Sequence, residues 1–267
     1  MKHKIASLLN KLRQTKPLVH NITNFVVMST TANALLSLGA SPIMAHAPEE
    51  IDDIIKIADA LVLNIGTLSK SWVNSMLIAA KSAKVKGIPI ILDPVGAGAS
   101  KFRTNIAQQL ISDFFPSVLK GNASEIIACA GIESKTKGVD SVNNVNDAKM
   151  SALEISRKYH LTVAVTGPED FITDGQRYFI VKNGHALMSK VTGTGCMASA
   201  IVGAFCAIEN DLFLATASAL SVFGIAGELA ATECRGPGTF SIKLIDSLYQ
   251  ITPDTIEKFA RIECQNL

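Results

Sequence analysis

The chain has 267 residues, of which 48% are hydrophobic and 18% are charged, and its formal net charge is +2. This length and composition suit a large α/β domain with a substantial core, and the near-neutral charge argues against a nucleic-acid-binding protein or an acidic tail. The mildly basic segment over residues 2–16 lacks the interleaved aromatic side chains of a nucleic-acid site. We therefore interpret that segment as the solvated face of a helix.

Cysteine usage and hydropathy bear on the compartment. The chain has five cysteines, an odd number, and none are spaced as C-x-x-C. With no recognisable signal peptide, this pattern predicts free thiols in a reducing cytoplasm. No uninterrupted apolar run reaches about 18 residues, so we expect no membrane span. The five histidines are scattered without the spacing of metal ligands.

The N-terminal quarter is predicted to be mainly helical. Residues 4–13 have the apolar spacing of an amphipathic helix, and residues 26–38 form a second helix that ends at a glycine. Between them, residues 18–24 are rich in side-chain amides and are expected to form a turn. A short extended segment at residues 41–44 precedes a helix that Pro48 opens.

A regular alternation of strands and helices follows. Apolar strands are predicted at residues 60–65, 88–92, 117–119 and 161–165. Helices are predicted at residues 69–84, 104–112, from 123 onward, and at 145–159. Strands that are apolar on both faces and separated by helices indicate a parallel sheet covered on both sides. Polar residues recur at the carboxyl ends of these strands, where ligands bind in open α/β sheets: Asn64, Asp93, Asn122, Glu125 and Thr166.

The pattern changes after Gly167. Residues 171–175 and 177–181 predict an antiparallel hairpin, and a last short strand is expected near Met188. The remainder is predicted to be helical, at residues 196–208, 212–232, 241–251 and 255–262. Because no repeat or long linker interrupts the chain, we expect a single domain over residues 1–267.

The segment V-T-G-T-G-C-M-A, residues 191–198, is the candidate catalytic centre. Gly193, Thr194 and Gly195 precede an apolar run of small residues, as in a turn that feeds a helix N-terminus. The unpaired backbone N–H groups and the helix dipole of such a turn bind anions, most often phosphate. Cys196 would lie in the first helical turn, where the same field is expected to lower the pKa of its thiol.

Two other interpretations also fit this segment. It fits the loosened dinucleotide fingerprint G-x-G-x-x-A, but that fingerprint belongs to a first βα unit, and here it comes late and between helices. It also fits a glycine-rich helix cap that binds nothing. Four cysteines lack this context and are interpreted as packing residues: Cys129, Cys206, Cys234 and Cys264.

Two acidic residues are candidates for holding a cation. Asn122 and Glu125 form N-x-x-E at a strand-to-helix turn, which fits plain helix capping or a carboxylate near phosphate-bound Mg²⁺. Asp93 is a second acid aimed at the same edge of the sheet. No G-x-x-x-x-G-K-[ST] motif occurs, so the sequence does not support a P-loop.

Several ordered motifs carry a resemblance to a known family. They are V-H-N-I-T-N (19–24), A-N (32–33), L-G-A-S-P-I-M (38–44), D-P-V-G-A (93–97), G-N-A-S-E (121–125), G-T-G-C (193–196) and G-P-G-T-F (236–240). From about residue 11 to the C-terminus the chain resembles the hydroxyethylthiazole kinase family, a ribokinase-like group in thiamin salvage. The resemblance implies a mostly parallel central sheet with helices on both faces and an antiparallel edge hairpin. It also implies ATP-dependent phosphorylation of 4-methyl-5-(2-hydroxyethyl)thiazole with Mg²⁺, by a homotrimer with sites near its subunit boundaries.

The resemblance further implies site residues. The substrate would lie around Asn24, Met44 and Gly193, and ATP near Lys120, Asn122 and Thr166. The family usually has arginine at the Lys120 position, and lysine is a point charge that cannot form a bidentate fork. Cys196 takes the place of the aspartate that is the presumed base in the wider group.

These residues support a mechanistic hypothesis. Backbone N–H groups of residues 193–196 would stabilise the transferred phosphoryl group, and Glu125, with Asp93 acting through water, would hold Mg²⁺. Lys120 would add positive charge, and Cys196 would orient or deprotonate the alcohol.

Three alternatives remain open from the sequence alone. The chain could be a kinase for another small vitamin-related alcohol. It could be a cysteine-nucleophile hydrolase or transferase, which would need a histidine such as His20 or His46 beside Cys196. It could also be a nucleotide-binding sensor without catalysis.

Overall fold

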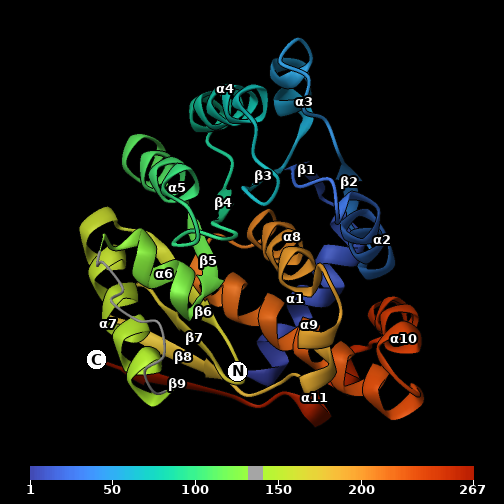
Figure 1. Ribbon diagram of the computed structural model, residues 1–267. Coiled ribbons are helices and arrows are strands. Elements are labelled where there is room, and N and C mark those ends of the chain that lie inside the picture. The colour runs from blue at the N-terminus through green and yellow to red at the C-terminus, as the bar shows by residue number, and fades with distance from the viewer. Residues whose placement is uncertain (132–140) are drawn as a thin grey trace.

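A computed structural model describes residues 1–131 and 141–267, apart from the side chains of residues 141–144. Within these residues one nine-stranded sheet runs through the molecule in the order β2-β1-β3-β4-β5-β6-β7-β8-β9 (Figure 1). Six strands pair in parallel: β1 (Leu18–Ile22), β2 (Ser41–Ile43), β3 (Ala60–Asn64), β4 (Ile90–Asp93), β5 (Val118–Asn122) and β6 (Thr162–Thr166). Three antiparallel strands complete one side: β7 (Asp170–Thr173), β8 (Arg177–Val181) and β9 (Ile262–Asn266).

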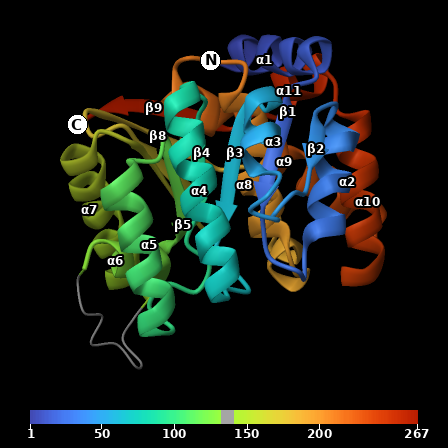
Figure 2. The same cartoon turned by 90° about the horizontal axis from the view of Figure 1, so that it is seen from above.

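Helices cover both faces of the sheet, each face with its own core (Figures 1 and 2). One layer contains α3 (Ile51–Ile57), α4 (Lys70–Lys86), α5 (Lys101–Phe114), α6 (Ala123–Cys129) and α7 (Ser141–Tyr159). The other contains α1 (Lys2–Thr15), α2 (Met28–Leu38), α8 (Thr194–Cys206), α9 (Leu212–Glu233), α10 (Pro237–Gln250) and α11 (Pro253–Phe259). This confirms the predicted mostly parallel sheet with helices on both faces and an antiparallel edge, although β9 lies outside the predicted hairpin of β7 and β8.

Helices α8 and α9 form the interior of the second layer because their small side chains allow close packing. A Cβ added at Gly203 of α8 would lie 2.8 Å from Cγ2 of Val62 on β3, so only glycine lets the helix approach the sheet this closely. Helix α9 is long and apolar enough to cross a membrane by length and composition, but 78% of its apolar window is buried inside the protein. It is therefore a core helix, as its alanine- and glycine-rich sequence allowed.

Local sequence signals place several helix ends. The side chain of Ser69 accepts a hydrogen bond from the N–H of Trp72 and so begins α4. Gly39 ends α2 in the left-handed conformation, with φ of 108°. A capping box of Asn122 and Glu125 begins α6 directly after β5. The chain thus turns sharply at the carboxyl ends of the strands, where the polar residues gather.

Three sequence-based predictions of secondary structure were wrong. Residues 18–24 were expected to form a turn, but residues 18–22 form β1, whose polar His20 and Asn21 are fully buried between β2 and β3. The segment near Met188 is the 3-10 helix η1 (Ala186–Lys190) and not a strand. The helix predicted over residues 255–262 ends at Phe259, and Ile262 instead begins β9, which pairs with β8. For β1 and β9, pairing with strands distant in the sequence outweighed the local pattern.

The packing role expected for four cysteines is confirmed for two of them. Cys129 and Cys206 are buried, and burial raises the pKa of each thiol to about 12. Cys234 is only half-buried, and Cys264 is exposed on the edge strand β9. The packing interpretation is therefore wrong for Cys264.

Candidate active site

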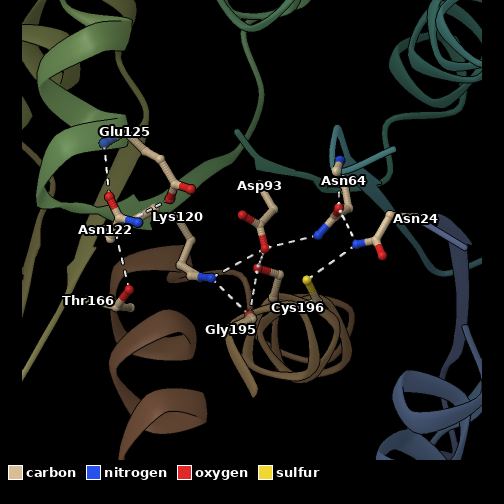
Figure 3. A network of polar contacts seen from close by, with 12 residues as sticks. Asn24, Asn64, Asp93, Lys120, Asn122, Glu125, Thr166, Gly195 and Cys196 are labelled. Carbon is tan, nitrogen blue, oxygen red and sulfur yellow. Dashed lines mark hydrogen bonds and ion pairs between the residues drawn. The ribbon is translucent and has the colours of Figure 1, made fainter. Parts of the chain in front are cut away.

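The predicted polar residues meet at the carboxyl edge of the parallel strands (Figure 3). The strand register places Asn64 beside Asp93 and Asn122 beside Thr166. Asn24 follows the end of β1, and its amide nitrogen donates to Oδ1 of Asn64 at 2.9 Å. Residues from four strands and from the loop after β1 thus face the N-terminus of α8.

The first turn of α8 is an uncapped helix N-terminus. Gly193 is the N-cap residue, its φ of 93° lies in the left-handed region, and no side chain in the described part of the chain caps the helix. The first N–H groups of the helix therefore have neither an intrahelical partner nor a side-chain partner. The Thr194 hydroxyl donates to the carbonyl of Met188 at 2.8 Å, so it anchors η1 instead of filling this position.

Asp93 is the centre of a buried polar network. Its Oδ2 accepts hydrogen bonds from Nδ2 of Asn64 at 3.2 Å, from Nζ of Lys120 at 3.3 Å and from Oγ of Ser199 at 2.6 Å. Nζ of Lys120 also donates to the carbonyl of Gly195 at 2.8 Å. Burial lowers the pKa of Lys120, but attraction to Asp93 and its neighbours outweighs this effect, so the pKa is raised. Lys120 is therefore a cation held under the first turn of α8.

Cys196 points away from Lys120, toward the loop after β1 (Figure 3). Its Sγ accepts a hydrogen bond from the amide of Asn24 at 3.4 Å. Burial and the negative charge of Asp93 raise the pKa of this thiol, and attraction to Lys120 only partly opposes them. The predicted lowering of the pKa is therefore wrong, because the thiol is largely shielded from water and lies near the carboxylate of Asp93.

Neither histidine proposed as a partner of Cys196 contacts it. Nε2 of His20 bonds the carbonyl of Ala45 at 2.7 Å, and His46 stacks on Trp72 with ring centroids 4.2 Å apart. Among the hydrogen bonds of the described residues, none joins a histidine to the thiol. The Cys–His pair of a cysteine nucleophile is therefore missing from this part of the chain.

Glu125 caps a helix and lines the site at once. Its Oε1 accepts from the N–H of Gly96 at 2.9 Å, and its Oε2 accepts from the N–H of Asn122 at 2.8 Å. Burial, and then the charge of Asp93, raise the pKa of Glu125. The capping interpretation of this motif is confirmed, and each oxygen keeps a lone pair for water.

The acidic groups fit a water-rich cation site. Over the described residues, no group of three or more histidine, cysteine or acidic side chains could form a metal cage. Mg²⁺ keeps several waters and needs one or two carboxylates, so Asp93 and Glu125 are a sufficient set. Among the described residues, the hydrogen bonds to the carboxylate of Asp93 all reach Oδ2, which leaves Oδ1 for such a water or cation.

A cavity of about 670 Å³ opens on the other side of the first turn of α8. Of the predicted residues, Asn122, Thr166, Thr194 and Gly195 line it. Asn24, Met44 and Cys196 are not among its lining residues; Met44 is half-buried at the end of β2, next to β1. Two of the three residues predicted for ATP, Asn122 and Thr166, thus line the cavity, whereas Lys120 and the residues predicted for the alcohol do not.

Two polar residues of the site were missed from the sequence. Asp170 begins β7 and lines the cavity, and burial raises its pKa to about 7. Ser199 is fully buried in α8. Its spacing of four residues from Gly195, on one helix face, was the available signal.

Comparison with known proteins shows where the chain belongs. The model of the hydroxyethylthiazole kinase family matches residues 9–254. The chain belongs to the hydroxyethylthiazole kinase family. It is 52% identical to the hydroxyethylthiazole kinase of Desulfotalea psychrophila, covering 96% of this chain and 93% of that one, and 52% identical to that of Pyrococcus furiosus, covering 97% of each.

Solved structures agree with this assignment. A hydroxyethylthiazole kinase structure from Pyrococcus horikoshii superimposes with a TM-score of 0.91 at 49% identity, covering 98% of this chain and 99% of that one. The pyridoxal kinase of Staphylococcus aureus in complex with ADP has a TM-score of 0.65 at 14% identity, covering 94% of this chain and 99% of that one. The second likeness shows a shared fold, which is the ribokinase-like fold expected from the sequence.

Proposed function

We propose that this protein transfers the γ-phosphoryl group of ATP to the hydroxyl of 4-methyl-5-(2-hydroxyethyl)thiazole. Relatives of this name align over nearly the full chain. The observation that carries the proposal is the uncapped first turn of α8, which lies between a cavity and the Cys196–Asn24 pair. Such a turn binds a phosphoryl group between a nucleotide on one side and an alcohol on the other.

The two substrates take opposite sides of this turn. ATP occupies the cavity, with Asn122 and Thr166 on its wall and its phosphates against Thr194 and Gly195. The alcohol lies near Asn24, Met44 and Gly193, with its hydroxyl next to Cys196. In this proposal the hydroxyl oxygen attacks the phosphoryl group from the side opposite the leaving oxygen, as phosphoryl transfer requires.

Charge neutralisation is the main task of the site, since phosphoryl transfer asks for little covalent chemistry from the protein. The N–H groups of residues 193–196 donate to the phosphoryl oxygens. Lys120 has three donors, of which two are engaged by Asp93 and Gly195, so the third is available for a phosphate oxygen. When bound, Mg²⁺ neutralises charge on the phosphates, and Asp93 and Glu125 would hold it through water.

Cys196 orients the alcohol in this mechanism. Since the pKa of its thiol is raised, the thiol stays protonated at neutral pH. A neutral thiol accepts and donates weak hydrogen bonds, and the amide of Asn24 fixes its direction. A loose transition state needs little help in removing the hydroxyl proton, so an orienting role is sufficient.

The same family membership leads us to propose a cytoplasmic homotrimer with Mg²⁺ and ATP as its cofactor and co-substrate. Light scattering on the purified protein tests the assembly, because a trimer has three times the mass of one chain. A mass equal to that of one chain would contradict it.

The function is tested by measuring ADP release from Mg-ATP with and without the thiazole, beside a panel of vitamin-related alcohols. We expect ADP only with the thiazole, together with formation of its phosphate ester. Release with a different alcohol would retain the phosphotransferase and overturn the substrate. No release with any alcohol would overturn the kinase assignment.

A further inference from the structure

Ser199 makes the shortest polar contact of the Asp93 network. Its side chain is 0% exposed, and its Oγ lies 2.6 Å from Oδ2 of Asp93. The same hydroxyl lies 3.4 Å from the carbonyl of Gly195, one turn earlier in α8. A serine has a single hydroxyl proton, and the short distance to a carboxylate oxygen directs that proton to Asp93.

The donors around Asp93 are arranged asymmetrically. Asn64, Lys120 and Ser199 all reach Oδ2, from β3, β5 and α8. Rotation of the carboxylate would break all three bonds, so its orientation is fixed. The other oxygen, Oδ1, lies on the side of Glu125 in Figure 3, away from the three donors.

Ser199 links Asp93 directly to the helix that carries the anion site, whereas Lys120 links them indirectly by bonding both Asp93 and the carbonyl of Gly195. Asn64 and Lys120 stand on strands of the same sheet as Asp93, and their bonds set the carboxylate relative to the sheet. Among the described residues, Ser199 is the one side chain of α8 that bonds the Asp93 carboxylate, so its bond sets the carboxylate relative to that helix.

We propose that Ser199 is a positioning residue for phosphoryl transfer, acting through Asp93. Its hydroxyl holds Oδ2 so that Oδ1 faces the phosphate side of the site at a fixed distance from the first turn of α8. The proposal rests on the proposed kinase function and assigns a role to a side chain that touches neither substrate. Ser199 thus orients the carboxylate of Asp93, and that carboxylate would help to hold the cation at the phosphates.

Other buried serines of the chain show that burial alone does not require such a bond. In the described part of the chain, the hydroxyls of Ser151 and Ser218 are buried without a hydrogen-bond partner. Ser218 lies in α9, is 0% exposed like Ser199, and does not line the cavity. The variant S218A therefore removes the same atom from an equally buried helix without disturbing Asp93.

The test compares S199A, S218A and the unaltered protein with the thiazole and Mg-ATP. We expect S199A to lower kcat by about 10- to 100-fold, the usual cost of losing a partner behind a group that acts on the reaction. The KM for the thiazole should change less than about twofold, because Ser199 does not touch it. S218A should keep both constants within about twofold. Thermal unfolding of the two variants should differ by only a few degrees.

A binding measurement without turnover provides the second readout. Calorimetric titration with a non-hydrolysable ATP analogue, at increasing Mg²⁺ and without the thiazole, reports how well the site holds the metal-bound nucleotide. S199A should need about tenfold more Mg²⁺ for the same affinity, while its affinity for the analogue without metal stays unchanged.

A double variant tests the route through Asp93. In a D93N background, adding S199A should lower kcat by less than about twofold, because the group it positions is already altered. A folded S199A with kcat and Mg²⁺ dependence within twofold of the unaltered protein would overturn the proposal. So would an equal loss in S218A, or a full additional loss in the D93N background. If the proposed kinase function itself were wrong, the unaltered protein would show no turnover of the thiazole with Mg-ATP, which distinguishes that failure from a failure of the role of Ser199.

Discussion

Single residues of this site derive their chemistry from burial and from the charges beside them. Cys196 occupies a helix N-terminus, a position that lowers the pKa of an exposed thiol. In this protein burial and the nearby carboxylate of Asp93 outweigh that effect, so the pKa of the Cys196 thiol is raised. The result is a neutral thiol suited to orient an alcohol and poorly suited to attack one.

The role of Cys196 is tested by substitution. We expect C196A to lower kcat by less than about 100-fold. A residue that only orients the alcohol contributes less to the rate than a general base that also removes its proton. C196D should remain active, since aspartate can accept the hydroxyl proton at the same place. Steady-state kinetics of both variants checks this, and complete inactivity of both would favour covalent chemistry at the thiol.

The raised pKa of Asp170 predicts a pH dependence of stability. Between about pH 4 and pH 7 the folded protein holds a proton here that the unfolded chain has lost, so stability falls as the pH rises through this window. The half-buried side chain of Asp170 lines the cavity, where water lowers the cost of burying its ionised form. We therefore expect the protein to lose about 1–4 kcal/mol of folding stability above pH 7.

The variant D170N measures this effect. Asparagine keeps an acceptor for the N–H of Gly167 but cannot ionise. Urea unfolding should show D170N to be more stable than the unaltered protein at pH 8 and nearly equal to it at pH 4. An equal pH slope in both proteins would contradict the assignment.

At the scale of elements, the α8 N-terminus depends on one backbone conformation and one close contact. Gly193 has a φ of 93°, and a Cβ added there would lie 2.8 Å from Cγ1 of Val27. The turn before α8 is thereby held against the residues that lead into α2. This contact sets where the free N–H groups of the helix point.

The variant G193A is expected to lose about 1–3 kcal/mol of stability, because alanine is strained at positive φ. It should also lose kcat, since the turn must shift away from Val27. G238A is the matched control: Gly238 lies in α10 with open space around its Cβ, and alanine there should be neutral or slightly stabilising. Chemical denaturation and kinetics of both variants provide the measurement, and unchanged kcat in G193A would show that the turn tolerates movement.

At the scale of the whole molecule, the C-terminal strand closes one side of the sheet. Strand β9, residues 262–266, pairs with residues 177–181 of β8, so the last residues of the chain form the outer strand of the sheet on that side (Figure 1). Without β9, the edge of β8 would present unpaired backbone groups next to Tyr178, Phe179 and Ile180. Such an edge pairs readily with other chains.

Removal of residues 262–267 is therefore expected to lower the unfolding temperature and to promote aggregation. Removal of Leu267 alone, which is 54% exposed, deletes one backbone hydrogen bond to Gln176 but keeps all the β8–β9 residue pairs, and serves as the control. Thermal unfolding with light scattering compares the two. A truncated protein as stable and as free of aggregates as the control would show that β8 tolerates an open edge.

The sequence by itself determined the parallel sheet, most helix positions and the polar strand ends, because periodicity, caps and turn residues are local signals. It also determined the family, since several motifs occur in order. The tertiary structure decided what depends on distant segments: β1 with its buried His20 and Asn21, and the edge strand β9. It likewise decided the direction of the Cys196 pKa shift, which depends on charges carried by other strands. It also decided the bond from Ser199 to Asp93, two residues that are 106 positions apart in the sequence. Spacing in a sequence records neither burial nor the charge that a fold brings alongside a side chain.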